Sequence, residues 1–281
     1  MFPDSILSQE RASSASEFIR SGVEVEVRGS DRQTLTGDSG GRTVTSTRTT
    51  VGAFFDTPLG QNTMLQTLLS YEYVDLDTQA GAFLPPSTER LQLDLGLAHR
   101  WNESWGTLLK ISPFLSGESL NSEALGVSGL LGIGWKLTEN FELLSGARFD
   151  SWSRYPIIPL IGARWNISDS LRIDATIPRA LIRWQASPAW ELQFGARFTN
   201  RTYRMGDSFG SDRDRPELNG GRLESSAIAV IVGSEWTVSE HAKLIMELGR
   251  DVWQRYEFEE QDHKFSSPDS WSLGLKVVWT F

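Results

Sequence analysis

Hydrophobic and polar residues alternate along most of this chain with a period of two, from about residue 17 to the end. In the last stretch one face carries Trp271, Leu273, Leu275, Val277, Trp279 and Phe281. Successive side chains of a β-strand point to opposite faces, and no helical spacing of apolar residues is sustained anywhere. The pattern therefore predicts an all-β protein.

Four nine-residue segments repeat a Trp, a short polar stretch and then a Leu or Ile. They are WKLTENFEL (135–143), WNISDSLRI (165–173), WQASPAWEL (184–192) and WTVSEHAKL (236–244). In each copy the Trp and the residues two, six and eight positions later share a parity and are mostly apolar. Each segment therefore predicts a tight hairpin turn between two strands whose apolar faces match.

The turns divide the chain into fourteen predicted strands. These are 17–28, 43–55, 63–76, 89–101, 105–116, 124–136, 141–150, 157–166, 171–178, 180–186, 190–204, 222–237, 242–258 and 271–281. Short turns, near 56–62, 101–106, 137–140, 167–170, 186–189 and 238–241, alternate with connections that are mostly longer or more polar. Short turns on one rim and longer loops on the other are typical of a transmembrane antiparallel up-and-down β-barrel, which has an even number of strands in bacteria. Twelve strands are the alternative, if the pair at 171–186 and another hairpin are misread.

Tryptophans recur where predicted strands meet the short turns. These positions are Trp101, Trp105, Trp135, Trp165, Trp184, Trp190, Trp236 and Trp279. Trp has an apolar body and one N–H donor, so it favours the level where hydrocarbon gives way to headgroups. We therefore predict an aromatic girdle at the membrane interface.

A soluble β-sandwich or propeller is the alternative architecture. Propellers repeat a blade every 40 to 45 residues, and no uniform period of that kind is visible. In a sandwich some strands should be apolar on both faces, whereas here the second face repeatedly carries Gly, Ser, Thr, Arg and Glu. The barrel is therefore favoured.

The chain ends in Trp279, Thr280 and Phe281 after an alternating strand. This ending resembles the C-terminal assembly signal of Gram-negative outer-membrane β-barrel proteins, with Trp279 and Phe281 in the aromatic positions. The resemblance implies residence in the bacterial outer membrane, contact with the lipid bilayer and lipopolysaccharide, and insertion by the barrel-assembly machinery. In size and strand number the chain is also similar to monomeric fourteen-stranded porins, and in style to uncharacterised outer-membrane barrel families.

Composition narrows the possible functions. The chain has 281 residues, a formal charge of −9 and no Cys. The acidic balance argues against a nucleic-acid partner, and the lack of Cys excludes a disulfide scaffold and a cysteine nucleophile. The start, MFPDSILSQERASS, lacks a basic segment followed by an apolar one, so no signal peptide is recognised. We expect residues 1–16 to form an N-terminal periplasmic segment and residues 17–281 to form the barrel.

The parity of each strand assigns a set of charged residues of both signs to the lumen. Those predicted to line a pore are Arg48, Glu72, Asp94, Arg100, Lys110, Lys136, Arg148, Arg164, Arg172, Asp174, Arg183, Arg197, Lys243, Glu247, Asp251 and Lys276. The same parity includes Arg20, Glu24, Glu26, Arg28, Glu142, Asp150, Glu191, Arg201, Glu235 and Arg255. An eight-stranded barrel is filled by side chains and sixteen strands leave an aqueous channel, so fourteen strands predict a modest polar lumen.

Three functions remain open. The favoured hypothesis is passive diffusion of small polar solutes, with the inward charges setting selectivity. The second is a structural or adhesive barrel whose lumen is occluded by the same charges in salt bridges. The third is a hydrolase acting from the external loops, where His263 lies beside Asp262 and near Ser266 and Ser267.

Other motifs carry weaker signals. GDSGG (37–41) resembles the nucleophile segment of trypsin-like proteases but lies in a polar loop without a matching His or Asp motif. The acidic loop SDRDRPELNGG (211–221) offers carboxylates for Ca²⁺ but lacks the EF-hand pattern. We expect no metal and no cofactor, and a single sequence does not determine the oligomeric state.

Overall fold

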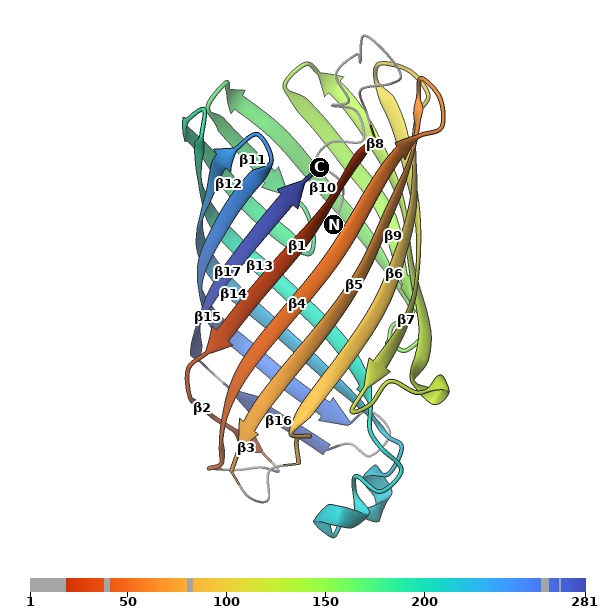
Figure 1. The fold of residues 1–281 in the computed structure, drawn as a ribbon, viewed down its shortest axis with the longest axis vertical. Coiled ribbons are helices and arrows are strands. Elements are labelled where there is room, and N and C mark those ends of the chain that lie inside the picture. Colours follow the sequence, from red (N-terminus) through yellow and green to blue (C-terminus); the bar gives the residue numbers. More distant parts are fainter. Residues whose placement is uncertain (1–18, 38–40, 80–82, 259–262, 268) are drawn as a thin grey trace.

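The computed structural model describes residues 19–37, 41–79, 83–258, 263–267 and 269–281, which form a closed, antiparallel up-and-down barrel of fourteen strands (Figure 1). The barrel strands are β1 (Arg20–Ser30), β4 (Thr43–Pro58), β5 (Thr63–Thr78), β6 (Ser87–Arg100), β7 (Trp105–Gly117), β8 (Leu125–Thr138), β9 (Phe141–Asp150), β10 (Ile157–Ser168), β11 (Leu171–Ala175), β12 (Arg179–Ser187), β13 (Trp190–Arg204), β14 (Arg222–Ser239), β15 (Ala242–Phe258) and β17 (Ser270–Thr280). The last strand pairs with the first, with Val277 opposite Val25. The predicted strand number of fourteen is confirmed, and the proposed segment 1–16 lies outside the described residues.

Six smaller elements lie in the connections. They are β2 (Gln33–Thr34), β3 (Thr36–Gly37), β16 (His263–Ser267) and the short 3-10 helices η1 (Ser122–Ala124), η2 (Ser211–Arg213) and η3 (Pro216–Leu218). β16 pairs with both β15 and β3, so the first and last long connections join in one small sheet. Within the described ranges no helix has the length and apolar character of a membrane span.

The two ends of the barrel differ as the turn lengths predict. At one end, the short-turn end, tight connections join β4 to β5, β6 to β7, β8 to β9, β10 to β11, β12 to β13 and β14 to β15. At the other end, the long-loop end, β2, β3, β16 and the 3-10 helices extend past the barrel wall (Figure 1). The chain therefore places its hairpin turns and its longer loops on opposite rims.

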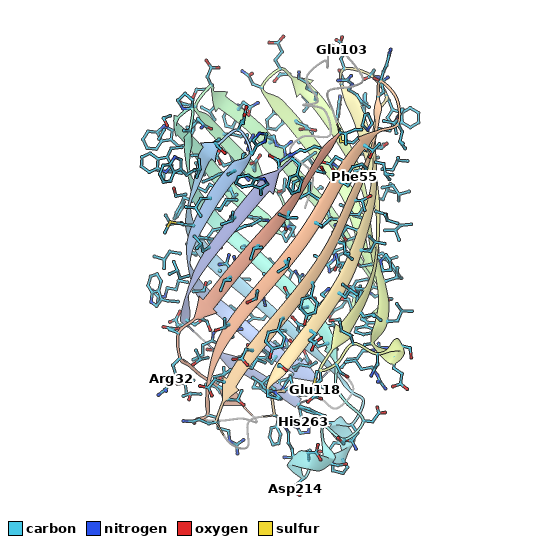
Figure 2. The ribbon with its side chains drawn as sticks, in the orientation of Figure 1. Arg32, Phe55, Glu103, Glu118, Asp214 and His263 are labelled. Carbon is cyan, nitrogen blue, oxygen red and sulfur yellow. The ribbon has the colours of Figure 1, made fainter. Side chains whose placement is uncertain are left out.

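The outer face of the wall is apolar and the inner face is largely polar. Ile161 is 82% exposed and Leu69 50% exposed, whereas Glu72 and Glu247 are only 7% and 5% exposed. Side chains project outward from the wall in the stick view (Figure 2), and large apolar residues on the outward parity of the strands are exposed. A soluble sandwich requires those residues in a shared dry centre, so that alternative is wrong.

One predicted inward position is overturned by a β-bulge in β15. Asp251 pairs with Ala229, but the next pair is Trp253 with Ile228, so Val252 is an extra residue. A single inserted residue reverses the parity of the strand beyond it. Tyr256 and Phe258 therefore point inward, and the prediction for Arg255 is wrong.

The barrel narrows towards its long-loop end because two distant strands meet there. Arg204 of β13 pairs in parallel with Gly117 of β7, and the Glu118 N–H donates to the Arg204 carbonyl at 2.9 Å. This pairing bypasses the five strands β8 to β12, so of the fourteen strands nine continue around the outermost level. A barrel of about eight strands has an interior that side chains fill. The long-loop end is therefore expected to be packed rather than open.

The bypass leaves two strand edges without a neighbouring strand in the described structure. β13 pairs with β12 only as far as Arg197, and β10 pairs with β11 only from Ala163 onwards. Pro159 lies on the free part of β10, where a missing N–H removes no ladder bond. On β13, Arg201 Nη1 donates to the Asn200 carbonyl at 3.2 Å and Ser116 Oγ to the Thr202 carbonyl at 2.8 Å. Side chains thus satisfy part of the open edge.

An apolar cluster, here called the cap, fills the narrow end. It consists of Leu35, Val44, Val74, Leu76, Leu84, Tyr203, Met205, Phe209, Leu218, Leu223, Tyr256, Phe258 and Phe265, with Phe83 packed against it. These residues come from inward positions of five barrel strands and from the long connections, and each of the thirteen is at most 7% exposed. The cap therefore closes the lumen at the long-loop end in this conformation.

Candidate functional site

Between the cap and the short-turn end, the inner wall carries the charged residues that the sequence assigned to it, apart from Arg255. Each residue predicted to line a pore lies on an inward-facing position of its strand, from Arg48 in β4 to Lys276 in β17. Their orientation follows the strand alternation, because their neighbours of opposite parity are the exposed apolar residues. A role in conduction stays a prediction, since orientation alone does not show passage.

The charged layer nearest the cap joins different parts of the wall. The Glu72 carboxylate of β5 lies 3.6 Å from Arg48 Nε and 3.7 Å from Arg201 Nε, and it accepts a hydrogen bond from the Tyr203 hydroxyl at 3.1 Å. Arg201 and Tyr203 belong to β13. Tyr203 is 131 residues away from Glu72 in the sequence. Contacts between β5 and β13 cross the lumen, so this layer is its constriction.

Tyr203 connects the constriction to the cap. Its ring belongs to the apolar cluster and is only 3% exposed, while its hydroxyl reaches the buried Glu72 carboxylate. A buried tyrosine hydroxyl requires a partner, and a charged acceptor makes the stronger hydrogen bond. The position of the cap and that of the charged layer are therefore coupled through one side chain.

A second layer is centred on Glu247 of β15. Arg28 Nη1 lies 2.8 Å and Arg179 Nη2 2.6 Å from its carboxylate, and Arg197 forms a third ion pair. These arginines belong to β1, β12 and β13, so one carboxylate links strands on both sides of β15. Opposite Arg28 the wall carries Gly274, where a Cβ would lie 2.8 Å from the guanidinium carbon, so glycine makes room for the layer.

A third layer lies towards the short-turn end. Arg164 donates from Nε to Asp174 at 2.8 Å and from Nη1 to Glu142 at 3.1 Å. Arg183 approaches Asp174 at 2.9 Å and donates to Glu191 at 2.9 Å. Ion pairs between neighbouring strands thus continue from β9 to β13.

Between the third layer and the short-turn rim lies a polar cavity of about 350 Å³. It is lined by Asn140, Asn166, Ser168, Asp169, Ser170, Leu171, Arg172, Arg183, Gln185 and Glu191. The lumen is thus hollow and polar at one end and apolar and filled at the other.

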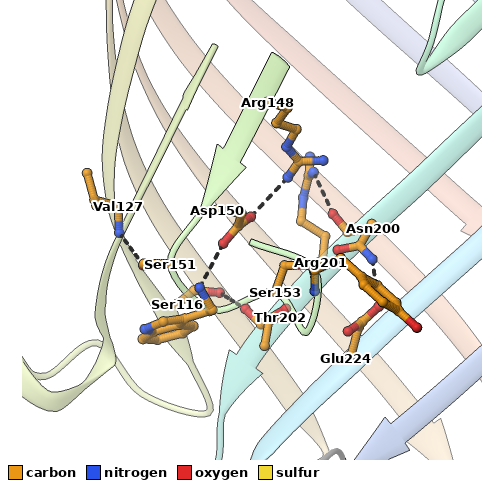
Figure 3. A network of polar contacts seen from close by, with 12 residues as sticks. Ser116, Val127, Arg148, Asp150, Ser151, Ser153, Asn200, Arg201, Thr202 and Glu224 are labelled. Carbon is orange, nitrogen blue, oxygen red and sulfur yellow. Dashed lines mark hydrogen bonds and ion pairs between the residues drawn. The ribbon is translucent and has the colours of Figure 1, made fainter. Parts of the chain in front are cut away.

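A polar network stands beside the open edge of β13. Arg148 of β9 donates to Asp150 at 3.0 Å, and Asp150 accepts the Trp152 N–H at 3.1 Å. On β13 itself, Asn200 donates to Glu224 of the paired strand β14 at 2.7 Å (Figure 3). The figure shows the guanidinium groups of Arg148 and Arg201 directed towards one another. The side of the lumen where strands are bypassed is therefore also charged.

Not all predicted lining residues join these layers. Asp94 and Lys110 form a separate pair at 3.0 Å, and Lys276 pairs with Glu24 at 2.6 Å. Lys243 pairs with Glu235 at 2.8 Å near the short-turn rim. The inward charges therefore form several local groups and no single ring.

Sequence reasoning missed two members of the layers, Arg179 and Tyr203, and one further buried inward charge, Arg90. Arg90 follows the inward parity of Asp94 but lies near the expected strand boundary, and Arg179 falls in what the sequence indicated as a turn. Both could have been found by extending the parity of their strands outwards. Tyr203 was missed because an aromatic residue in a barrel strand suggests lipid contact. Here β13 approaches β7, so the Tyr203 ring lies in a packed interior.

The eight predicted girdle tryptophans lie on the outer face near the short-turn end, with exposures from 40% at Trp105 and Trp135 to 65% at Trp101. The rings of Trp105 and Trp135 stack with centroids 5.0 Å apart. At the chain end Phe281 is 72% exposed, and its N–H donates to the Ser21 carbonyl at 2.9 Å. The girdle and the assembly signal stay predictions, because position does not test a contact with lipid or with another protein.

The hydrolytic arrangement predicted around His263 is only partly described, and it stays a prediction. His263 begins β16, its Nε2 lies 3.8 Å from the Glu217 carboxylate, and the Ser266 hydroxyl lies 3.0 Å from that of Thr36. Asp262 and residues 38–40 of the GDSGG motif lie outside the described residues.

The acidic loop 211–221 folds into η2 and η3. In the described residues no group of three or more His, Asp or Glu side chains is arranged to hold a metal. The pKa of Glu217 lies below its ordinary value, because its own backbone N–H and the Arg215 guanidinium donate to the carboxylate. The loop thus uses its carboxylates in local contacts.

Known structures share this architecture at low sequence identity. The COG4313 outer membrane channel from Pseudomonas putida F1 is 16% identical, with 94% of this chain and 95% of that chain covered at a TM-score of 0.54. A FadL homologue from Pseudomonas aeruginosa is 8% identical, with 94% and 90% covered at a TM-score of 0.50. These likenesses show the fold, which is that of outer-membrane β-barrels. No curated protein matches the sequence.

A family model extends over residues 27–278, nearly the whole barrel, and carries the description "Domain of unknown function (DUF6268)". The chain is therefore a member of this family.

Proposed function

We propose that this protein is a channel of the bacterial outer membrane that passes small polar solutes through the barrel lumen and is closed by its cap in the conformation described here. The lipid bilayer and lipopolysaccharide surround the apolar outer face, and the barrel-assembly machinery inserts the chain. The inward charges then act as selectivity determinants.

The charged inner wall is the observation that carries this proposal. Replacing buried ion pairs by well-packed apolar residues is often neutral or stabilising, so a permanently dry lumen gains little from them. Here Glu72, Asp94, Glu142, Asp174 and Glu247 are all between 5% and 8% exposed and all paired with basic groups. A wall that meets water and solutes when the cap moves explains this composition.

A second candidate, a structural barrel with a permanently filled lumen, is favoured by one observation. The contact of Glu72 with Tyr203 and Arg201 bridges the lumen directly, and the residues of the adjacent cap are almost inaccessible to solvent. In that case the ion pairs hold the wall in shape and nothing passes. Only a measurement of conduction separates the two candidates.

The experiment is single-channel recording in planar bilayers on the full chain and on the double variant Phe209→Ser, Leu218→Ser. Both side chains belong to the cap and are 1% exposed, but they come from the connection between β13 and β14, so the barrel strands stay intact. We expect brief openings of the unmodified protein and a sustained current of the variant. The matched control, Leu59→Ser, changes an exposed residue at the short-turn end and should behave like the unmodified protein.

Folding of each variant is checked by the shift in gel mobility on heating. If both folded proteins seal the bilayer, the channel proposal is wrong and the structural barrel replaces it. An equal, sustained current in all three proteins would support the channel and contradict closure by the cap.

A further inference from the structure

The polar cavity at the short-turn end has the size of a small-molecule site. Its volume of about 350 Å³ lies near the lower bound of about 300 Å³ for ligand pockets. Its lining comes from the β8–β9 and β10–β11 turns and from strands β10 to β13, so it is a concave part of the inner wall.

Arg172 has unused hydrogen-bonding capacity in this cavity. Its Nε lies 3.3 Å from Asp174, without the geometry of a hydrogen bond, and its two terminal nitrogens form no hydrogen bond or ion pair within the described residues. Asp174 is already shared by Arg164 and Arg183, which approach it at 2.8 and 2.9 Å. Of these three arginines Arg172 is the most exposed, at 32% of its side chain against 10% and 14%.

An open guanidinium fork matches the two oxygens of a carboxylate. The two parallel N–H groups form a bidentate, charge-assisted pair, which fixes orientation and also contributes more than a neutral hydrogen bond. Arg172 therefore supplies the anion-binding part of the cavity.

Neutral polar groups stand around this fork. Asn140 and Asn166 both line the cavity, and in the described part of the chain their side-chain amides have no protein partner. Ser170 and Gln185 contribute a hydroxyl and a further amide to the lining. Groups of this kind donate to and accept from hydroxyls, so they suit a solute that carries several of them.

Two acids limit the charge of the ligand. Glu191 lines the cavity and accepts from Arg183 at 2.9 Å through one oxygen, while Asp169 lies in the turn at the rim. The other basic residue of the lining, Arg183, is already paired with Asp174 and Glu191, so a second carboxylate on the ligand would compete with these acids for it. The lining therefore favours a single negative charge.

We propose that this cavity binds a small, hydroxylated monocarboxylate, with the carboxylate on Arg172 and the hydroxyls on Asn140, Asn166 and Ser170. As a step in transport the site rests on the proposed channel, but binding itself does not require conduction. The substrate class of the channel would then be hydroxylated organic acids.

The test is a saturation-transfer NMR titration of the purified full chain in detergent micelles. D-gluconate is the probe, glucose offers similar hydroxyls without the carboxylate, and glucarate adds a second carboxylate. We expect gluconate to bind at least tenfold more tightly than either comparison compound. Arg172→Gln should weaken gluconate binding about 10- to 100-fold, the range for removing hydrogen bonds to a charged group.

Two further variants separate the fork from general charge. Arg250→Gln removes an exposed positive charge outside the cavity and outside the predicted pore lining, so gluconate binding should be unchanged. Arg172→Lys keeps the charge without the fork and should retain part of the affinity.

The site is refuted if glucose or glucarate binds as tightly as gluconate to the unmodified protein, a comparison that needs no variant to fold. It is also refuted if folded Arg172→Gln binds gluconate within twofold of the unmodified protein. Bilayer recordings keep the two proposals apart: current without gluconate binding removes only this site, and gluconate binding to a sealed barrel removes only the channel.

Discussion

Glu247 is the carboxylate on which the second charged layer depends, so Glu247→Gln tests whether the lumen is held by ion pairs. The side chain is 5% exposed and forms ion pairs with Arg28, Arg179 and Arg197 from three strands. Gln has nearly the same shape and can still accept hydrogen bonds, but it carries no charge. The substitution leaves three guanidinium groups around a neutral centre.

The expected cost follows from that geometry. At an effective dielectric constant of 20, opposite unit charges about 4 Å apart attract by about 4 kcal/mol, before desolvation and the repulsion among the arginines are subtracted. Removing one partner of a buried ion pair costs about 3–5 kcal/mol in measured cases. We expect a loss of about 3–4 kcal/mol, because the amide keeps part of the hydrogen bonding.

Glu24→Gln is the matched control. Glu24 also faces the lumen, but within the described residues its one ion-pair partner is Lys276, at 2.6 Å, and the two side chains are 23% and 27% exposed. Solvent screening limits such a pair to about 1 kcal/mol or less. The two variants thus lose the same charge in different surroundings.

The assay is reversible urea unfolding of the barrel in detergent micelles, followed by tryptophan fluorescence, with free energies from linear extrapolation. A cost for Glu247→Gln within 1 kcal/mol of that for Glu24→Gln would show that the layer is hydrated and contributes little. That result would refute the packed layer but not the barrel.

Three shorter predictions address the cap and its loop. Tyr203→Phe removes the hydrogen bond to Glu72 and should cost about 1.5–3 kcal/mol in the same unfolding assay while raising the frequency of channel openings; an unchanged free energy of unfolding would contradict the coupling. Phe258→Ala empties a fully buried position of the cap and should cost about 3–5 kcal/mol, whereas Phe281→Ala at the exposed end should cost less than 1 kcal/mol. Since the pKa of folded Glu217 is lowered, its contribution is present above the ordinary Glu pKa and is lost as pH falls through the lowered value; protease cleavage in the 205–221 loop should therefore rise under acid conditions in the unmodified protein, and Glu217→Gln should remove that pH dependence.

Most of the fold could be predicted because a membrane barrel is repetitive at the level of single residues. Each wall residue has only two choices, lipid or lumen, so period-two alternation fixes orientation without knowledge of tertiary contacts. The parity of Glu72, Glu247 and Arg172 follows directly from this rule. The predicted and observed strands differ by three residues or fewer at each end, because turn residues separate them clearly.

The failures lie where one residue or one tertiary contact changes the rule. The extra Val252 has no sequence signature that distinguishes it from a neighbouring wall residue, yet it reverses every side chain from Trp253 to Phe258. The pairing of Arg204 with Gly117 joins segments separated by five strands, and no local pattern predicts it. The constriction partners could thus be placed on the inner wall by sequence, but their contacts across the lumen could not.

The parallel pairing of β7 with β13 explains why the lumen is charged in one half and apolar in the other. Where all fourteen strands surround it, the interior has room for ion pairs and for the cavity beside Arg172. Where five strands are bypassed, the remaining ring approaches the size at which side chains alone fill a barrel, and a dry interior favours apolar residues because unpaired charges there are costly. The cap is therefore the core of a narrower barrel built onto a wider one. Opening it requires the loop residues of the cap to leave, or β7 and β13 to separate, and the Tyr203 contact to Glu72 must break in the same event.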